Sequence, residues 1–183
     1  MRKTVWHNAH HWQHGDLPTQ LRAWLLDSTS MTQRLRTHCG AQFQVAVLEQ
    51  SWQHPQLDEA RWLGLPVRQY ARVRQVYLCC QQQPWLFGRT VIPLTMLYGN
   101  YRYLTRLGDQ PLGAVLFAHH SLRRSDLQFT RLRQGDSLYT LATKHLENEP
   151  PFLYARRSVF YLEHKPLLVT EVFLPEMLNA LAD

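Results

Sequence analysis

The chain of 183 residues is poor in several features that would identify common protein classes. It has no apolar run of the roughly 18 residues that span a bilayer, so no membrane insertion is expected. No apolar segment follows the two cations at the N-terminus, which argues against a signal peptide and for a cytoplasmic protein. The sequence also has no glycine-rich phosphate loop, no G-x-S-x-G and no H-E-x-x-H. It therefore does not indicate a P-loop nucleotide-binding enzyme, an α/β-hydrolase or a zinc metalloprotease of the H-E-x-x-H type.

Cysteine is scarce, and histidine is concentrated near the N-terminus. The cysteines are Cys39, Cys79 and Cys80. Adjacent cysteines on a strand point to opposite faces and no Cys-x-x-Cys occurs, so we expect neither a zinc site nor a disulfide framework. The clustered histidines are His7, His10, His11 and His14. They lie in a polar segment, where adventitious metal binding is the ordinary outcome, and no functional metal is predicted.

The net charge is +6, and the cations are almost all arginine. A basic surface suits nucleic acid, an anionic small substrate or no specific partner. The arginines are scattered along the chain and accompany no recognised nucleic-acid motif, so nucleic acid is not expected as a partner.

Hydrophobic periodicity predicts strands that form hairpins, with helices before the sheet and between its hairpins. The expected strands are residues 43–50, 67–80, 85–92, 121–133, 154–162 and 167–174. Helices are expected after Pro18, from Met31 to a stop at Gly40, and after Pro111. We therefore predict one α+β domain, residues 1–183, with an antiparallel sheet of about six strands. Helices should cover one face and enclose an internal ligand cavity, and residues 1–17 should form a flexible arm.

The last predicted strand carries an acid between apolar residues. Leu167, Val169, Glu171 and Phe173 share one face, and the alternate residues of the other face are also largely apolar. An unpaired carboxylate in such a layer costs several kcal/mol by rough estimate, so Glu171 needs a cation, hydrogen bonds or a proton. On this pattern alone, a structural ion pair and a site residue are equally compatible.

Several segments, in order, resemble one enzyme family. They are residues 30–34, 74–79, 84–93, 107–108 with 111–113, 156–158 and 165–175. Together they resemble bacterial chorismate pyruvate-lyases over roughly residues 18 to 178, although the histidine-rich arm and the stretches 99–106 and 134–150 depart from the family pattern. The resemblance implies a monomeric lyase that converts chorismate to 4-hydroxybenzoate and pyruvate, the first committed step of ubiquinone ring synthesis.

The resemblance also implies the site. The family's substrate-binding positions fall on Met31, Arg74, Leu112 and Glu171, with Arg74 and Glu171 as the catalytic side chains. The backbone would act at Met31 and Leu112. Arg74 would bind the ring carboxylate, because a guanidinium donates two parallel hydrogen bonds and stays charged when buried.

Glu171 would accept a hydrogen bond from the 4-hydroxyl, and whether it positions the ring or acts as a general base is left open. It should face a cavity and form no direct ion pair with Arg74. Aromatisation drives the reaction, so no cofactor or metal is expected.

Other parts of the reaction are less determined. The enolpyruvyl carboxylate could meet Arg89, or Arg156 and Arg157, and the sequence does not choose among them. A closed pocket predicts slow product release, gated by helices near residues 20–36 or 94–118.

Two non-enzyme functions compete with the lyase. By resemblance, the same fold serves as the ligand-sensing domain of bacterial repressors, but these carry a winged-helix domain ahead of it. Only about 17 residues precede the first expected helix here, so the enzyme is favoured. A basic RNA-binding module is a third and weaker alternative.

Overall fold

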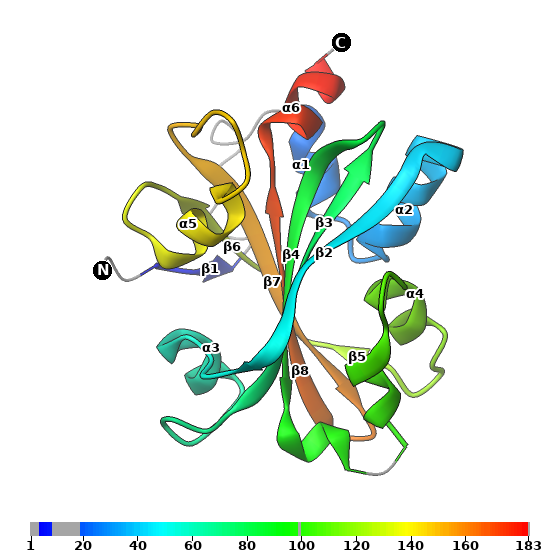
Figure 1. The fold of residues 1–183 in the computed structure, drawn as a ribbon, viewed down its shortest axis with the longest axis vertical. Coiled ribbons are helices and arrows are strands. Elements are labelled where there is room, and N and C mark those ends of the chain that lie inside the picture. Colours follow the sequence, from blue (N-terminus) through cyan, green and yellow to red (C-terminus); the bar gives the residue numbers. More distant parts are fainter. Residues whose placement is uncertain (1–3, 9–18, 99, 183) are drawn as a thin grey trace.

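A computed structural model describes residues 4–8, 19–98 and 100–182 as an α+β protein built on one open sheet (Figure 1). The strands are β1 (His7–Asn8), β2 (Phe43–Gln53), β3 (Ala71–Cys80), β4 (Gln83–Pro93), β5 (Arg123–Arg124), β6 (Gln128–Leu132), β7 (Leu153–Leu162) and β8 (Lys165–Phe173). Their order is β1-β6-β7-β8-β4-β3-β2, and β5 also pairs with β7. Each of these pairings is antiparallel, as predicted.

The sheet has eight strands rather than the expected six. One extra strand is β1, and the other arises because the predicted strand 121–133 is divided into β5 and β6. The division lies at Ser125, whose backbone N–H donates to the Val159 carbonyl while its hydroxyl accepts from the Val159 N–H. Because Ser125 uses its side chain in place of a ladder hydrogen bond, the strand is interrupted there.

Helices cover both faces of the sheet, so the prediction of helices over one face was wrong. They are α1 (Thr19–Leu25), α2 (Met31–Cys39), α3 (Leu57–Trp62), α4 (Leu112–Phe117), α5 (Ser137–Thr143) and α6 (Pro175–Ala182), with short 3-10 turns η2 (Gly40–Gln42), η3 (Leu94–Leu97) and η4 (Arg102–Arg106). Figure 1 shows α3 and α5 on one side of the strands and α2 and α4 on the other.

The two faces differ in their side chains. The face that carries Val76, Leu86 and Phe160 packs against α1, α2, α4 and α6, and we call it the site face. The opposite face carries Val73 and Tyr77 among others and packs against α3 and α5. Since alternate residues of the central strands are apolar on both sides, each side needs a cover.

Strand β2 contains a bulge where it pairs with β3. Val47 lies opposite Val76, but the next paired residue is Glu49, which lies opposite Gln75. Leu48 is therefore an extra residue, and it packs against the core of the opposite face. Beyond the bulge, Gln50 lies opposite Arg74 on the site face.

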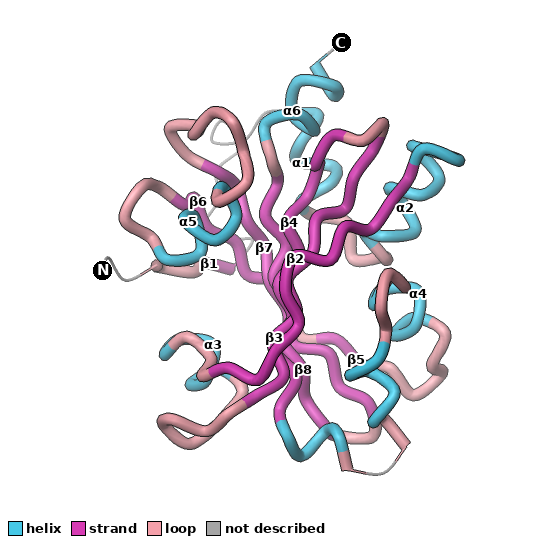
Figure 2. The backbone as a smooth tube through the Cα atoms, viewed as in Figure 1, coloured by secondary structure: helices cyan, strands magenta, loops and turns pink. Residues whose placement is uncertain are grey.

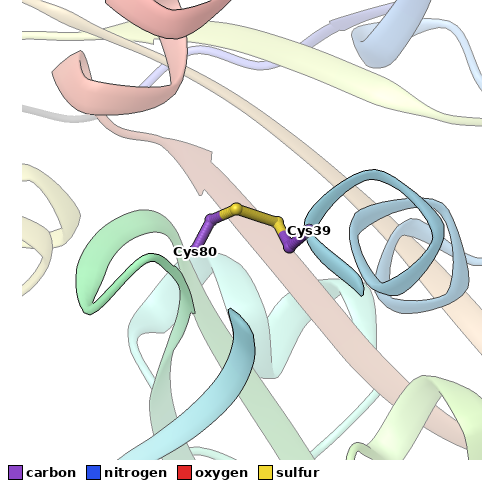
Figure 3. Close-up of a disulfide and its surroundings, with 2 residues drawn as sticks. All are labelled: Cys39 and Cys80. Carbon is purple, nitrogen blue, oxygen red and sulfur yellow. A yellow bond between two sulfur atoms is a disulfide. The ribbon is translucent and has the colours of Figure 1, made fainter. Parts of the chain in front are cut away.

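Cys39 and Cys80 form a disulfide, so the expectation of none was wrong (Figure 3). Cys39 is the last residue of α2 and Cys80 the last of β3, and their Cα atoms are 5.6 Å apart. Cys79 and Cys80 do point to opposite faces, and Cys79 is a buried free thiol in the other core. The packing of α2 on the site face brings Cys39 to Cys80, which spacing along the chain does not reveal.

Part of the expected flexible arm lies on the protein. Strand β1 pairs with β6, and the Thr130 hydroxyl donates to the Val5 carbonyl at 2.7 Å. The Trp6 indole N–H donates to Asp58 at 3.2 Å. The rest of the arm, including His10, His11 and His14, lies outside the described residues. No helix in the described part of the chain is long and apolar enough to span a membrane.

Candidate functional site

A pocket lies on the site face, where the N-terminal ends of α2 and α4 approach the central strands. Figure 2 shows α2 and α4 on the same side of these strands. Its lining includes all four residues that the sequence singled out: Met31, Arg74, Leu112 and Glu171. Most other lining residues are apolar, among them Val76, Leu78, Leu86, Leu116 and Phe160. An apolar cavity with a few converging polar groups is the usual form of a small-molecule site.

Strand register separates Arg74 from Glu171 across the floor of the pocket. Arg74 on β3 lies opposite Thr90 on β4, and Gly88 on β4 lies opposite Glu171 on β8. The two charged residues are thus two strands apart, about 10 Å in the hydrogen-bonding direction, and are offset along the strands. They form no ion pair with each other, as expected. The lining of the pocket between them includes Gly88 and Thr90 of β4.

The Arg74 guanidinium is fixed by one of its edges. Nη1 donates to the Gly108 carbonyl at 2.7 Å and to Gln50 Oε1 at 3.2 Å, and Nη2 donates to the Gln110 carbonyl at 3.2 Å. Of the five N–H donors of a guanidinium, the Nε–H and one Nη2–H are left. Arg89 uses this same Nε and Nη2 edge to hold both oxygens of Glu59. Arg74 therefore keeps the geometry that binds a carboxylate through two hydrogen bonds.

Arg74 is a buried cation. The residue is 2% exposed, and burial lowers the pKa of its guanidinium while the nearby Asp109 opposes that change. Because the partners of Arg74 are neutral carbonyls, its positive charge has no bound counterion within the described residues. An anion in the pocket would supply one.

Glu171 forms an ion pair with the buried Arg156. Its Oε2 accepts a hydrogen bond from Arg156 Nε at 2.5 Å. Arg156 also donates through Nη1 to the carbonyls of Trp24, Leu25 and Asp27. The Arg156 side chain is fully buried, whereas that of Glu171 is 14% exposed and lines the pocket. Glu171 therefore fits both readings of its sequence position, a structural ion pair and a site residue, since it is paired with Arg156 and also lines the pocket.

Backbone amides complete the polar side of the pocket. Helix α2 begins at Met31, and its N-cap Ser30 accepts from the Gln33 N–H at 3.3 Å. The amides of Met31 and Leu112 are the first of their helices and have no partner within them. The two helix starts are close together, because a Cβ at Gly113 would lie 2.8 Å from Thr32 Oγ1 and 3.1 Å from Ser30 Oγ.

We expect Gly113→Ala to damage the site. The added methyl would separate the starts of α2 and α4, which should cost about 1–3 kcal/mol of stability, more than the ~1 kcal/mol that alanine gains in a helix. Turnover should fall about tenfold, because the Met31 and Leu112 amides would be displaced by a fraction of an ångström. Denaturant unfolding and steady-state kinetics measure both, and Thr32→Ala in the same chain should restore part of the loss. A Gly113→Ala protein with higher stability and full activity would contradict the crowding.

Two arginines considered for a second carboxylate lie outside the pocket. Arg89 and Arg157 are on the opposite face, where they form ion pairs with Glu59 and Asp58 of α3. The third, Arg156, is on the site face but is not part of the pocket lining. The resemblance alone did not distinguish these positions, because each lies on a strand that is buried on both faces.

Sequence reasoning missed Arg124, which lines the pocket beside Glu171. Its Nε donates to Ser158 Oγ at 2.7 Å, and its Nη1 donates to the Ser28 carbonyl at 2.9 Å. Burial and the neighbouring Arg156 lower the pKa of Arg124 while Glu171 and Asp27 raise it, and together these effects lower it to about 10. Arg124 is charged at neutral pH, since its pKa is about three units higher. No motif marked it, because the strand break at Ser125 that directs it inward was not foreseen.

The fold is shared with bacterial regulators. The C-terminal domain of PhnF matches with a TM-score of 0.58 and 14% identity, covering 75% of this chain and 86% of that one. A GntR-family transcriptional regulator from Bacillus cereus matches with a TM-score of 0.54 and 14% identity, covering 74% of this chain and 94% of that one. At such identities the likeness shows the fold alone.

Sequence comparisons point to an enzyme family. A probable chorismate pyruvate-lyase of an Azoarcus species is 42% identical over 164 residues, which is 87% of this chain and 86% of that protein. A chorismate pyruvate-lyase of Hamiltonella defensa is 39% identical over 160 residues, covering 87% of this chain and 81% of that protein. The model of the chorismate lyase family matches residues 1–181. Because the match extends over nearly the whole chain, this protein belongs to the chorismate lyase family.

Proposed function

We infer that the protein is a lyase that converts chorismate to 4-hydroxybenzoate and pyruvate. Family membership carries the reaction. The arrangement of the pocket supports it: a buried guanidinium with two free donors lies two strands from a carboxylate, with an apolar floor between them. The relatives of similar length are lyases, so a ligand-sensing role without catalysis is not favoured.

The proposed orientation places the ring over Gly88 and Thr90. Arg74 binds the ring carboxylate through Nε and Nη2, and the amides of Met31 and Leu112 approach the same anion. Glu171 accepts a hydrogen bond from the 4-hydroxyl at the other end of the ring. The apolar lining keeps water from the reacting carbons and suits an aromatic product.

We propose that Glu171 acts mainly by positioning. In that route the hydrogen on C4 passes within the substrate to the enolpyruvyl methylene as the C3–O bond breaks. Pyruvate leaves with a new methyl hydrogen, and the ring becomes aromatic. No external base is needed, and the electron pairs balance within one cyclic rearrangement. The ion pair with Arg156 supports this role, because it keeps the acid in place as a hydrogen-bond acceptor.

Chorismate labelled with deuterium at C4 tests this route. We expect the label in the methyl group of pyruvate, detected by mass spectrometry or NMR. Glu171→Gln keeps the shape of the side chain and should lower kcat about tenfold by losing orientation; a general base would cost about 100- to 10,000-fold. Complete loss of label to water, together with a fall in the larger range, would instead assign Glu171 as the base.

The reaction itself is tested more simply. The purified protein and chorismate alone, without added metal, should yield 4-hydroxybenzoate by its absorbance and pyruvate by a coupled assay. A chain that binds chorismate but releases neither product would be a sensor rather than an enzyme. We further propose that the protein acts as a monomer in the cytoplasm, with chorismate as substrate and 4-hydroxybenzoate as product, and with helices α2 and α4 controlling release of the product.

A further inference from the structure

Chorismate carries two carboxylates, and the orientation proposed above gives a partner to only one of them. The ring carboxylate meets Arg74 and the 4-hydroxyl meets Glu171. The enolpyruvyl group is attached to C3, next to the hydroxyl-bearing carbon, so its carboxylate must lie near Glu171. A carboxylate in an apolar pocket needs a cation or several hydrogen bonds. The structure should therefore provide a second cation on the Glu171 side.

Arg124 is the cation in that place. Arg74 and Arg124 are the arginines on the wall of the pocket, within the part of the chain that the structure describes. Arg124 stands on β5 beside β7, and Arg156 on β7 lies directly opposite Glu171 on β8. Arg124 and Glu171 both line the pocket, and Glu171 is ion-paired with Arg156, so the three charged groups lie on the same side of it. Arg74 is on the other side of β4.

The Arg124 guanidinium is held so that one end stays free. Its Nε is fixed to Ser158 and its Nη1 to the Ser28 carbonyl, and its Cζ lies 4.8 Å from the centre of the Phe160 ring. Two of its five N–H donors are used, which leaves one on Nη1 and both on Nη2. Arg124 forms no ion pair with another described residue. It is a positioned cation without a bound anion.

We propose that Arg124 binds the enolpyruvyl carboxylate of chorismate through Nη1 and Nη2. The inference rests on the proposed function and adds the specificity for the leaving group. Arg74 and Arg124 then hold the two carboxylates from opposite ends of the pocket, and Glu171 holds the hydroxyl between them. This arrangement fixes the enolpyruvyl methylene near C4, as the cyclic rearrangement requires. After C3–O cleavage, Arg124 is left holding the carboxylate of pyruvate.

Arg124→Gln separates this role from a structural one. We expect kcat/KM for chorismate to fall about 100- to 1,000-fold, the usual effect of removing a charged donor from a reacting group. The Kd for 4-hydroxybenzoate should change by less than about threefold, because that product has no enolpyruvyl carboxylate. Arg123→Gln is the matched control, since its side chain is exposed on the same strand, and it should behave as the unmodified protein.

A change in the substrate gives an independent test with the unmodified protein. Chorismate esterified with methanol at the enolpyruvyl carboxylate should react about 100-fold more slowly or worse, and Arg124→Gln should cause little further loss on this ester. If Arg124→Gln weakened the binding of 4-hydroxybenzoate as much as that of chorismate, the proposal would be wrong. Arg124 would then be structural or would bind the ring carboxylate. Unchanged kcat/KM would also overturn it. If the unmodified protein failed to turn chorismate over, the proposed function would fail separately, and titrations with chorismate would still test Arg124.

Discussion

Replacement of Arg156 by methionine should lower the free energy of unfolding by roughly 3–5 kcal/mol. The Arg156 side chain is fully buried and bonds to Glu171 and to the carbonyls of Trp24, Leu25 and Asp27. Methionine fills similar space but leaves the carboxylate and three carbonyls without donors. The segment between α1 and α2 would lose its attachment to the sheet, so activity should fall as well.

Urea unfolding followed by circular dichroism measures this loss. Arg157→Met is the matched control, because Arg157 is the next residue and its partner Asp58 is 30% exposed, so about 1 kcal/mol is expected there. The double change Arg156→Met with Glu171→Gln should be less destabilising than the sum of the two single changes, because no charge is then left unpaired. A loss below about 1 kcal/mol for Arg156→Met would mean that the bonds to Arg156 are not formed in solution.

The disulfide between Cys39 and Cys80 gives the second large effect. It closes a loop with a sequence separation of 41 residues, for which chain entropy predicts a stabilisation of about 4 kcal/mol. The oxidised protein should therefore unfold at markedly higher urea concentration than the reduced protein. Since α2 begins at Met31 in the pocket and ends at Cys39, reduction should also loosen this wall of the site.

Mass spectrometry of the alkylated protein would count the free thiols, and unfolding with and without a phosphine reductant would measure the stability. Cys39→Ser should match the reduced protein and respond to no reductant. Cys79→Ser is the control, because this buried thiol lies in the other core and its loss should leave the response to reductant intact. Three free thiols in a protein purified without reductant would show that the bond does not form under those conditions.

The sequence predicted the strands and the helix starts better than it predicted which side chains meet. Alternation marked residues 167–174 as a strand buried on both faces, and the helix predicted from Met31 to a stop at Gly40 is α2. These signals are local, because they depend on backbone preferences and on period. The disulfide and the position of Arg124 depend on packing between distant segments, so no local pattern contained them.

The partner of Glu171 lay within reach of the sequence. Strands β7 and β8 form a hairpin with a two-residue turn at Glu163 and His164, where both residues have positive φ. In such a hairpin, Leu162 pairs with Lys165, and counting back along both strands brings Arg156 opposite Glu171. Register could thus have separated Arg156 from Arg157, which the resemblance alone did not.

The bulge in β2 determines the charge beside Arg74. If Leu48 were paired in register instead of bulged, the pairing that begins at Val47 and Val76 would place Leu48 opposite Gln75 and Glu49 opposite Arg74. A carboxylate there would neutralise the guanidinium and compete with any substrate. The bulge instead sends Glu49 to Gln75 on the opposite face and presents the neutral amide of Gln50 to Arg74. The bulge at Leu48 therefore keeps the pocket cationic, so a change that moved Glu49 by one position in this register would alter anion affinity without touching a residue of the pocket.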